Sequence, residues 1–410
     1  MNLESRIERF RQKGLGLFVH YGPYVQYQHG EWTLNLRQMD PAVYESKALS
    51  YDYSSFDAGN IIKAAKACGA RYVTMTTRHH DGFSLYDTRG LSDYDIMHTP
   101  NGRDIVKEFC DACHANGIMP FLYHTTLDWH HPDFTADFDR YQDYLKASIE
   151  ILCRNYGEIG GFWLDGNWSM PADVWDLDGL YSVIRRYQPD AIIINNTGLE
   201  AQGVLGHREI DCVTFEQGRP QKLDCSALER LYMGEMCYPL CEHWGIADDI
   251  NIKSMRQILE AMIACRAVGA NFLLGIFTNP DGTQPLLHAG YLQAIGQWID
   301  QHKEAFFEAA PCEITGFGKD FALRKGNTCY LFIHDVGTWG DANVLKTARR
   351  GPSVFENFAL PVKCARWMEH GEPVRYSQDL DQGLLVVDPL PFTYGESRIV
   401  RVAELELEGG

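Results

Sequence analysis

Short apolar runs alternate with helix-like segments along the first three quarters of the chain. Each run has the length of a buried strand, and several are rich in β-branched residues. Between the runs, apolar residues recur every three or four positions, which predicts helices that pack on a sheet. The expected strands are 14–22, 70–78, 118–123, 160–165, 191–195, one ending at Glu216, one ending near Glu235, and 271–277; the expected helices are 56–68, 101–116, 141–156, 175–187, 253–268 and 286–305.

Strand and helix therefore alternate about eight times. This alternation predicts an α/β fold, a (β/α)8-like (TIM-type) barrel over residues 1–308. The pattern is weakest after the fifth and sixth strands, where no helix is evident. From about Pro311 the runs become short and alternating, as at 328–333, 362–367 and 384–387, with turn residues between them. We therefore expect a small C-terminal β-sandwich over residues 309–410.

Composition narrows the classes of partner. The chain has 410 residues, enough for one large domain and a smaller one, with a net charge of -18 and a pI near 5.2. Nucleic acid and anionic membrane surfaces attract clustered Lys and Arg, which this chain lacks, so neither is an expected partner. A neutral small ligand fits the composition better.

The sequence favours a cytoplasmic protein without a cofactor or metal. Its first residues are polar and charged, and no run of about 18 apolar residues occurs. Twelve scattered cysteines form no disulfide framework and suit a reducing compartment. Zinc would need a second pair of soft ligands beside Cys110 and Cys113. The adjacent His79 and His80 would point to opposite sides of a strand, which is a poor arrangement for chelation, although metal binding is the competing interpretation of the histidines.

The strand 160–165 carries the strongest candidate for chemistry. It ends in Asp165 and then Gly166, so the carboxylate would lie at the carboxyl end of a buried parallel strand. In a barrel of this type, that end is the catalytic rim. Trp163 lies two residues earlier on the same face and could stack on a sugar ring beside a nucleophilic Asp165. The alternative is a structural aspartate that caps the next helix.

Other polar residues gather at the same predicted rim. Because the carboxyl ends of all eight strands meet there, imidazoles, carboxylates and indoles from distant positions would face one ligand. Such groups suit a neutral polyol: the polar ones bind hydroxyls, and tryptophan covers the apolar face of a ring. The candidates are His20, His79, His80, His124, Asp165, Glu216 and Glu235 at strand ends, with Glu31 and Trp32 in a rim loop.

Hydrolysis of a glycoside with retention needs a nucleophile and an acid/base whose carboxyl groups lie about 5 to 5.5 Å apart. Asp165 is the candidate nucleophile. Glu235 and Glu216 are the candidates for the acid/base, because both are expected on the rim across the barrel.

These residues form motifs that resemble the α-L-fucosidases of glycoside hydrolase family 29. The resemblance extends from about residue 10 to about 310, in order. Two departures stand out: Tyr21 and Gly234 replace tryptophans of the family pattern. The matching segments include 16–22, Glu31-Trp32, 78–83 (RHHDGF), 103–106 (RDIV), 122–125, 162–166 (FWLDG), 214–220 and 234–237 (GEMC).

The resemblance implies a retaining exo-α-L-fucosidase that hydrolyses fucosylated oligosaccharides or glycosides without a cofactor. It implies Asp165 as the nucleophile and Glu235 as the acid/base, with Glu216 as the alternative. Two other functions stay open: a catalytically silent fucose-binding barrel, and a glycosidase for a stereochemically related sugar. The oligomeric state is also open, a homo-oligomer included. The implied substrate-binding residues are His20, Glu31, Trp32, His79, His80, His124, Trp163 and Arg219.

Overall fold

The computed structural model describes residues 3–225, 230–345 and 350–409. The chain forms two compact units: Met1–Lys253 with Ala270–Gln293, and Ser254–Gly269 with Ala294–Gly410. The two units interleave along the sequence, so a single boundary after residue 308 stays a prediction. In the described part of the chain, no helix is both long and apolar enough to cross a membrane.

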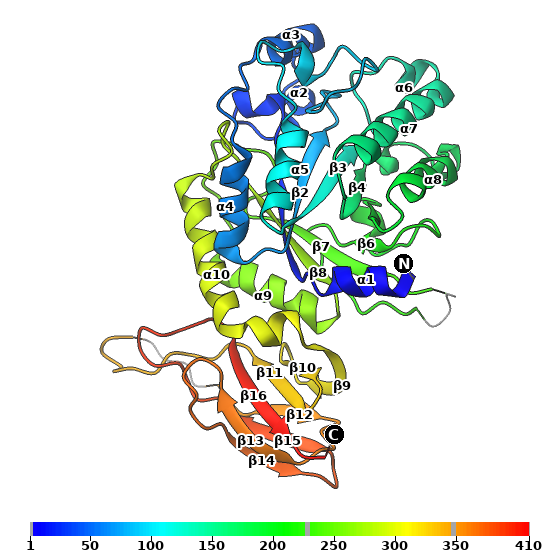
Figure 1. The fold of residues 1–410 in the computed structure, drawn as a ribbon. Helices are drawn as coiled ribbons and strands as arrows, with labels where there is room; N and C mark the ends of the chain where they lie inside the picture. Colours follow the sequence, from blue (N-terminus) through cyan, green and yellow to red (C-terminus); the bar gives the residue numbers. More distant parts are fainter. Residues whose placement is uncertain (1–2, 226–229, 346–349, 410) are drawn as a thin grey trace. The chain divides into compact units, whose positions relative to one another are not determined.

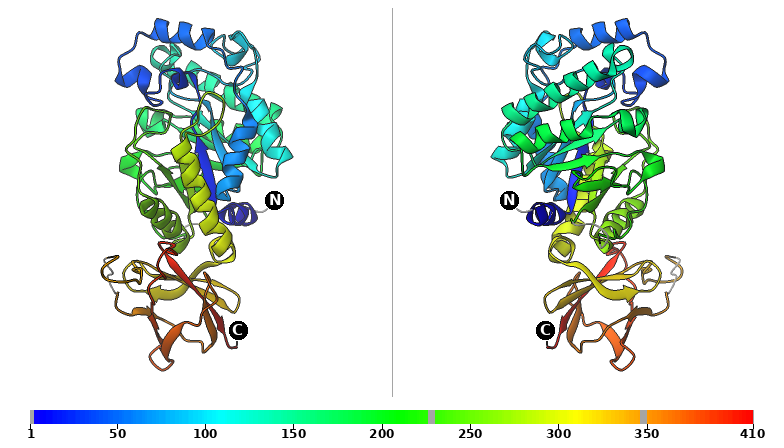
Figure 2. Two further views of the ribbon diagram at one scale, coloured as in Figure 1. Left: turned by 90° about the vertical axis from the view of Figure 1, so that its left-hand side faces the viewer. Right: turned by 90° about the vertical axis from the view of Figure 1, so that its right-hand side faces the viewer.

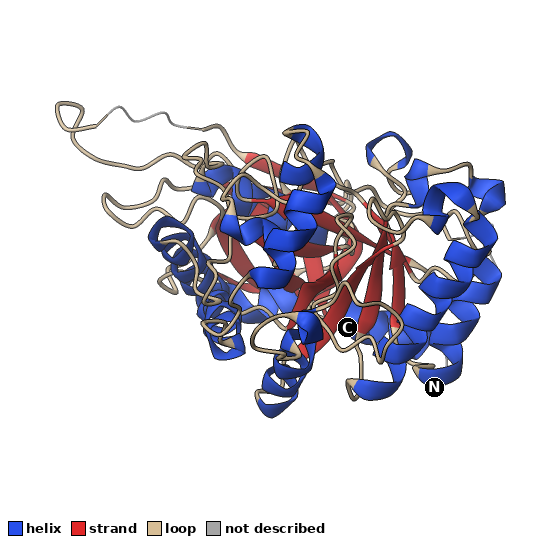
Figure 3. Ribbon diagram, turned by 90° about the horizontal axis from the view of Figure 1, so that it is seen from above, coloured by secondary structure: helices blue, strands red, loops and turns tan. Residues whose placement is uncertain are grey.

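The first unit contains a closed barrel of eight parallel strands in sequence order, as predicted (Figure 1). Seen from above, the strands stand in the middle with helices outside them (Figure 3). The strands are β1 (Leu15–Val19), β2 (Tyr72–Arg78), β3 (Met119–Thr125), β4 (Gly161–Asp165), β5 (Ile192–Asn195), β6 (Cys212–Thr214), β7 (Met233–Pro239) and β8 (Asn271–Ile276).

The predicted helices are present, with ends that differ by a few residues. Helices α7 and α8 lie side by side outside the barrel (Figure 2). Between β5 and β6 the structure has only a 3-10 turn, and no helix occurs between β6 and β7 in the part described, where the sequence also gave no helical pattern. The helices are α1 (Leu3–Arg11), α2 (Thr33–Leu36), α3 (Pro41–Ser50), α4 (Ala58–Cys68), α5 (Ile105–Ala115), α6 (Asp133–Ala136), α7 (Phe138–Asn155), α8 (Leu177–Tyr187), α9 (Met255–Ala267) and α10 (Leu286–Phe307).

Side chains fill the barrel and close its amino-terminal end. Phe10 of α1 packs against Tyr72 and Phe121, with ring centroids 5.2 and 5.0 Å apart. Burying a phenylalanine in this way stabilises the fold by roughly 2 kcal/mol. Glycine makes room for these rings, since a Cβ at Gly161 would lie 2.3 Å from the Phe121 ring. With this end plugged, the carboxyl ends of the strands are left to form the open face of the barrel.

The second unit holds the antiparallel strands of the predicted β-sandwich. Their hydrogen-bonded order is β13-β16-β11-β10-β9-β12-β15-β14. Inward side chains of these strands share one apolar core, which includes Leu331, Phe355, Leu385 and Leu405. The strands are β9 (Ala310–Gly316), β10 (Phe321–Lys325), β11 (Thr328–Ile333), β12 (Ser353–Glu356), β13 (Val362–Trp367), β14 (Arg375–Asp379), β15 (Leu384–Asp388) and β16 (Arg401–Leu407).

Candidate active site

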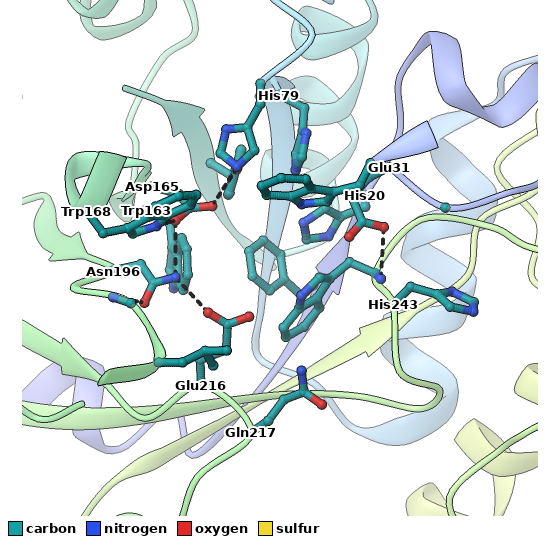
Figure 4. Close-up of a pocket in the computed structure, with 18 of the residues that line it drawn as sticks. His20, Glu31, His79, Trp163, Asp165, Trp168, Asn196, Glu216, Gln217 and His243 are labelled. Atoms are coloured by element: carbon teal, nitrogen blue, oxygen red, sulfur yellow. Dashed lines mark hydrogen bonds and ion pairs between the residues drawn. The ribbon is translucent and has the colours of Figure 1, made fainter. Parts of the chain in front are cut away.

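A pocket of about 810 Å³ opens at the carboxyl ends of the barrel strands (Figure 4). It forms there because each parallel strand delivers its last residues to the same face of the barrel. The structure brings eight of the predicted site residues to this pocket. They are His20, Glu31, Trp32, His79, His80, Trp163, Asp165 and Glu216.

Asp165 is the last residue of β4, and its side chain is 13% exposed. Gly166 follows with a φ of 107°, a conformation that favours glycine and turns the chain away from the strand. Three donors hold the carboxylate: Tyr123 OH at 2.8 Å, Trp168 Nε1 at 3.1 Å and Asn196 Nδ2 at 3.1 Å. These bonds fix the orientation of the Asp165 side chain, which lines the pocket.

Asn196 also holds the second carboxylate of the site. Its Nδ2 donates to Glu216 Oε2 at 2.8 Å and to Asp165 Oδ1 at 3.1 Å. Two oxygens bound to one nitrogen at these distances cannot lie more than about 6 Å apart, a limit that includes the spacing of about 5 to 5.5 Å of retaining glycosidases. The Asn196 side-chain carbonyl in turn accepts from Thr214 Oγ1 at 3.0 Å, which fixes the orientation of the amide.

Glu216 and Asp165 differ in their environments. Burial raises the pKa of Glu216 to about 7, and the negative charge of Asp165 adds to the rise. Glu216 can therefore hold a proton near neutral pH, while the side chain of Asp165 accepts three hydrogen bonds. A neighbouring acid and carboxylate of this kind can carry out general acid catalysis and nucleophilic attack.

Three of the histidines that line the pocket, His20, His79 and His80, are neutral at pH 7. Burial lowers the pKa of His20 to about 3 and also lowers the pKa values of His79 and His80. The hydroxyl of Thr125 donates to the Leu127 carbonyl, so it accepts from His80 Nδ1 at 2.7 Å. The other ring nitrogen, Nε2, lies 3.5 Å from Asp165 Oδ2 and can accept a hydrogen bond from a ligand hydroxyl.

Glu31 and three tryptophans shape the walls of the pocket. Glu31 Oε2 accepts from the backbone N–H groups of Trp244 and Gly245, at 3.0 and 2.7 Å. This places the Trp244 ring against His20, with centroids 5.4 Å apart and planes 24° apart. The Trp32 ring lies nearly parallel to the Trp168 ring, with planes 17° apart and centroids 6.3 Å apart. Aromatic faces beside neutral polar groups suit a sugar ring.

Glu235 does not reach the pocket, which corrects the expectation that it lies on the rim. Strand β7 runs on to Pro239, so Glu235 lies inside the strand and not at its end. It pairs with Thr214 of β6, which comes two residues before Glu216. Its side chain is fully buried in the barrel, and it accepts from Tyr72 OH at 2.5 Å and Trp163 Nε1 at 3.0 Å. Burial raises the pKa of Glu235 to about 7.

His124 is also absent from the pocket, contrary to expectation. Side chains alternate along β3, and Tyr123 points into the pocket, so His124 points outward. It is fully buried there, with Nδ1 2.8 Å from Thr77 Oγ1 and Nε2 2.7 Å from Arg78 Nη2. Its interactions are those of a structural residue behind the barrel wall.

Arg219 is the third predicted residue that the structure leaves outside the pocket. It is exposed in the loop after β6, and it is not among the residues that line the cavity. Gln217, two residues earlier, lines the pocket instead, and it adopts a φ of 51°. The backbone turns at this point, so the residues beyond it leave the rim.

Four residues that the sequence reasoning did not single out complete the site: Tyr123, Trp168, Asn196 and Trp244. Asn196 directly follows the end of β5, and Trp168 comes three residues after the end of β4, so the rule that identified Asp165 could have found them. Among the residues that the structure describes, no three His, Cys, Asp or Glu side chains gather closely enough to hold a metal ion.

Comparisons with known proteins identify the family of the chain. The α-L-fucosidase family model matches residues 2–304, most of the chain. A putative α-L-fucosidase of Caenorhabditis elegans is 25% identical over 325 residues, which are 72% of this chain and 65% of that protein. The chain thus spans just under two thirds of the length of that relative.

Solved structures show the same two-part fold. α-L-Fucosidase isoenzyme 1 of Paenibacillus thiaminolyticus matches with a TM-score of 0.85 and 29% identity, over 99% of this chain and all of that one. A Bacteroides thetaiotaomicron α-L-fucosidase, trapped as a covalent intermediate with 2-fluoro-fucosyl fluoride, matches with a TM-score of 0.81 and 19% identity, over 99% and 96%. The barrel, the pocket with its paired carboxylates and the family match lead to one conclusion: the chain belongs to the α-L-fucosidase family of glycoside hydrolases.

Proposed function

We propose that this protein is a retaining exo-α-L-fucosidase that removes terminal fucose from fucosylated oligosaccharides or glycosides. The observation that carries the proposal is the Asn196 amide, which holds Asp165 and Glu216 within about 6 Å of each other at an open pocket. A silent sugar-binding protein would not need two carboxyl groups at this spacing, one of them with its pKa raised to about 7.

In the proposed mechanism, Asp165 attacks the anomeric carbon of fucose while Glu216 gives its proton to the leaving oxygen. The bond to the leaving group breaks as an ester forms between fucose and Asp165. Glu216, now ionised, takes a proton from water, and the hydroxide displaces Asp165 and restores both carboxyl groups. Two inversions give fucose with the configuration of the substrate. Tyr123, Trp168 and Asn196 hold Asp165 in line for the attack.

The rest of the pocket would bind the sugar. Neutral His20, His79 and His80 can accept hydrogen bonds from ring hydroxyls without attracting an anion. Glu31 is anchored through one oxygen, which leaves the other for the ligand. Trp163 closes the floor of the pocket beside Phe18, at a centroid distance of 4.9 Å. A pocket with a floor accepts the end of a glycan, which favours exo action.

Hydrolysis of 4-nitrophenyl α-L-fucoside, followed by proton NMR, tests the proposed function. The first product is expected to be α-L-fucose, which then mutarotates. A panel with the matching β-galactoside and other pyranosides separates the rival sugar specificities. Fucose binding without release of nitrophenol, or β-L-fucose as the first product, would reject a retaining fucosidase.

The pH dependence of kcat/KM should follow the loss of the proton from Glu216. The pKa of Glu216 near 7 means that the acid loses its proton as the pH rises through neutrality, so kcat/KM should fall about tenfold per pH unit well above pH 7. In Glu216→Gln this alkaline limb should disappear, because the amide does not titrate. An unchanged limb in that variant would assign the titration to another group.

Glu235→Gln distinguishes the two glutamates. The amide can still accept from Trp163 and can donate to Tyr72, so we expect a loss of stability of only about 1 kcal/mol and less than a tenfold change in kcat/KM. The alkaline limb of the pH profile should stay. Thermal unfolding and the same nitrophenyl assay measure both effects. A loss of kcat as large as that of Glu216→Gln, in a folded variant, would return the acid role to Glu235.

A further inference from the structure

The loop that follows β5 is bound to Asn196, which bridges the two carboxylates, and to the backbone of Glu216. Its Gly198 N–H donates to the side-chain oxygen of Asn196 at 3.2 Å, and Gln202 Nε2 donates to the backbone carbonyl of Glu216 at 2.8 Å. Gly198 also lies against the Trp168 ring, since a Cβ there would be 3.4 Å from it. Residues 198–201 and Trp168 thus form one wall of the pocket that starts at the carboxylates.

This wall is apolar and acidic. Leu199 and Trp168 are 62% and 43% exposed, and both line the pocket, so they offer apolar surface to a ligand there. Glu200 stands beside Leu199, and Glu242 lines the pocket elsewhere; both are exposed. They have no counter-charge in the pocket, because none of the described lining residues is Lys or Arg. The lining residue His243 is paired with Asp249, which lies 2.8 Å from its Nε2.

We infer that the wall formed by Trp168 and residues 198–201 is the aglycone subsite, and that it selects neutral leaving groups with an apolar face over anionic ones. The inference rests on the proposed function: Glu216 protonates the leaving oxygen, so the leaving group must lie on the side of Glu216 and its attached loop. Leu199 and Trp168 cover the apolar face. Glu200 and Glu242 repel a carboxylate or sulfate carried by the leaving group.

Two aryl fucosides that differ mainly in charge test this selection. The 4-carboxyphenyl and 4-carbamoylphenyl α-L-fucosides have similar shapes. For each protein, the kcat/KM of the carboxyphenyl substrate is divided by that of the carbamoylphenyl substrate. Comparing this ratio between Glu200→Gln and the unaltered protein cancels the intrinsic reactivity of the two substrates. Removing one charge near the ring should raise kcat/KM for the carboxyphenyl substrate relative to the carbamoylphenyl one about fivefold at low salt. Glu200→Lys should raise the ratio further, and 0.5 M salt should reduce both effects.

Asp143→Asn is the matched control, since it removes the same charge from an exposed position on α7 outside the pocket. It should leave the ratio unchanged. For the apolar face, Leu199→Ser should lower kcat/KM for the carbamoylphenyl fucoside about threefold relative to fucosyl fluoride, whose leaving group cannot reach the wall.

The outcomes separate the inference from the function on which it rests. Hydrolysis of neither aryl fucoside nor of fucosyl fluoride would reject the proposed function itself. Hydrolysis of both aryl fucosides, with the same ratio in the unaltered protein, Glu200→Gln and Glu200→Lys, would overturn the charge selection and leave the fucosidase intact. An equal shift in Asp143→Asn would also overturn it, because the effect would then come from the net charge of the protein.

Discussion

Replacing Asp165 by glycine is expected to lower kcat for 4-nitrophenyl α-L-fucoside by at least about a thousandfold, or about 4 kcal/mol in activation free energy. The variant has no carboxylate to form the glycosyl ester, and the donors Tyr123, Trp168 and Asn196 lose their shared acceptor. The nitrophenyl assay measures the loss.

Azide should restore part of the activity of Asp165→Gly and so show that the protein is folded. A small anion can enter the space left by the side chain and attack the anomeric carbon directly. Because this is a single displacement, the product should be the inverted β-L-fucosyl azide, which NMR distinguishes from the α anomer. Activity close to that of the unaltered protein, in the absence of azide, would contradict the nucleophilic role.

The second large effect is expected for Glu216→Gln. Loss of the proton donor should lower kcat/KM by roughly a hundred- to a thousandfold for a natural fucoside, whose leaving alkoxide needs protonation. The loss should be much smaller for fucosyl fluoride, which needs little acid assistance. Parallel assays with the two substrates measure the difference, and equal losses would argue against an acid role.

Glu216→Gly with azide provides the control. Here the covalent intermediate on Asp165 still forms from an activated substrate, and azide attacks it as the second of two displacements. The product should therefore be the α-L-fucosyl azide, with the configuration of the substrate. Formation of the β anomer would exchange the proposed roles of the two carboxylates.

The barrel was predictable because its signal is repeated. Eight apolar runs separated by helical patterns leave few other folds, and strands such as β2 and β8 are clear from β-branched or leucine-rich runs alone. The short β6 gave less signal: it has three residues, and Glu216 lies two positions beyond it and not at its end. The cytoplasmic location and a homo-oligomeric state stay predictions, since neither follows from the fold of one chain.

Much of the site was predictable for the same reason. Residues at the carboxyl ends of parallel strands converge whatever the sequence between them, and this rule alone brought His20, His80 and Asp165 together. It depends on knowing where each strand ends. The sequence placed the end of β7 near Glu235, whereas the strand continues to Pro239 and carries that glutamate inside the barrel.

The direction of each side chain was the second feature of the site that the sequence did not predict. His124 and Tyr123 are neighbours at the end of β3, and only one of them can face the pocket. The tyrosine does, while the histidine packs with Arg78 on the outside. Asn196 was missed because an amide beside a strand end suggests a turn more readily than chemistry. Its function depends on contacts with both carboxylates, which only the folded chain shows.

Trapping the covalent intermediate tests the central claim most directly. The protein would be incubated with 2-fluoro-fucosyl fluoride, digested with trypsin and mapped by tandem mass spectrometry. We expect one fluorofucosyl ester, on Asp165 in the peptide between Arg154 and Arg185. An ester on Glu216 or Glu235, or no ester in a preparation that hydrolyses fucosides with retention, would contradict it.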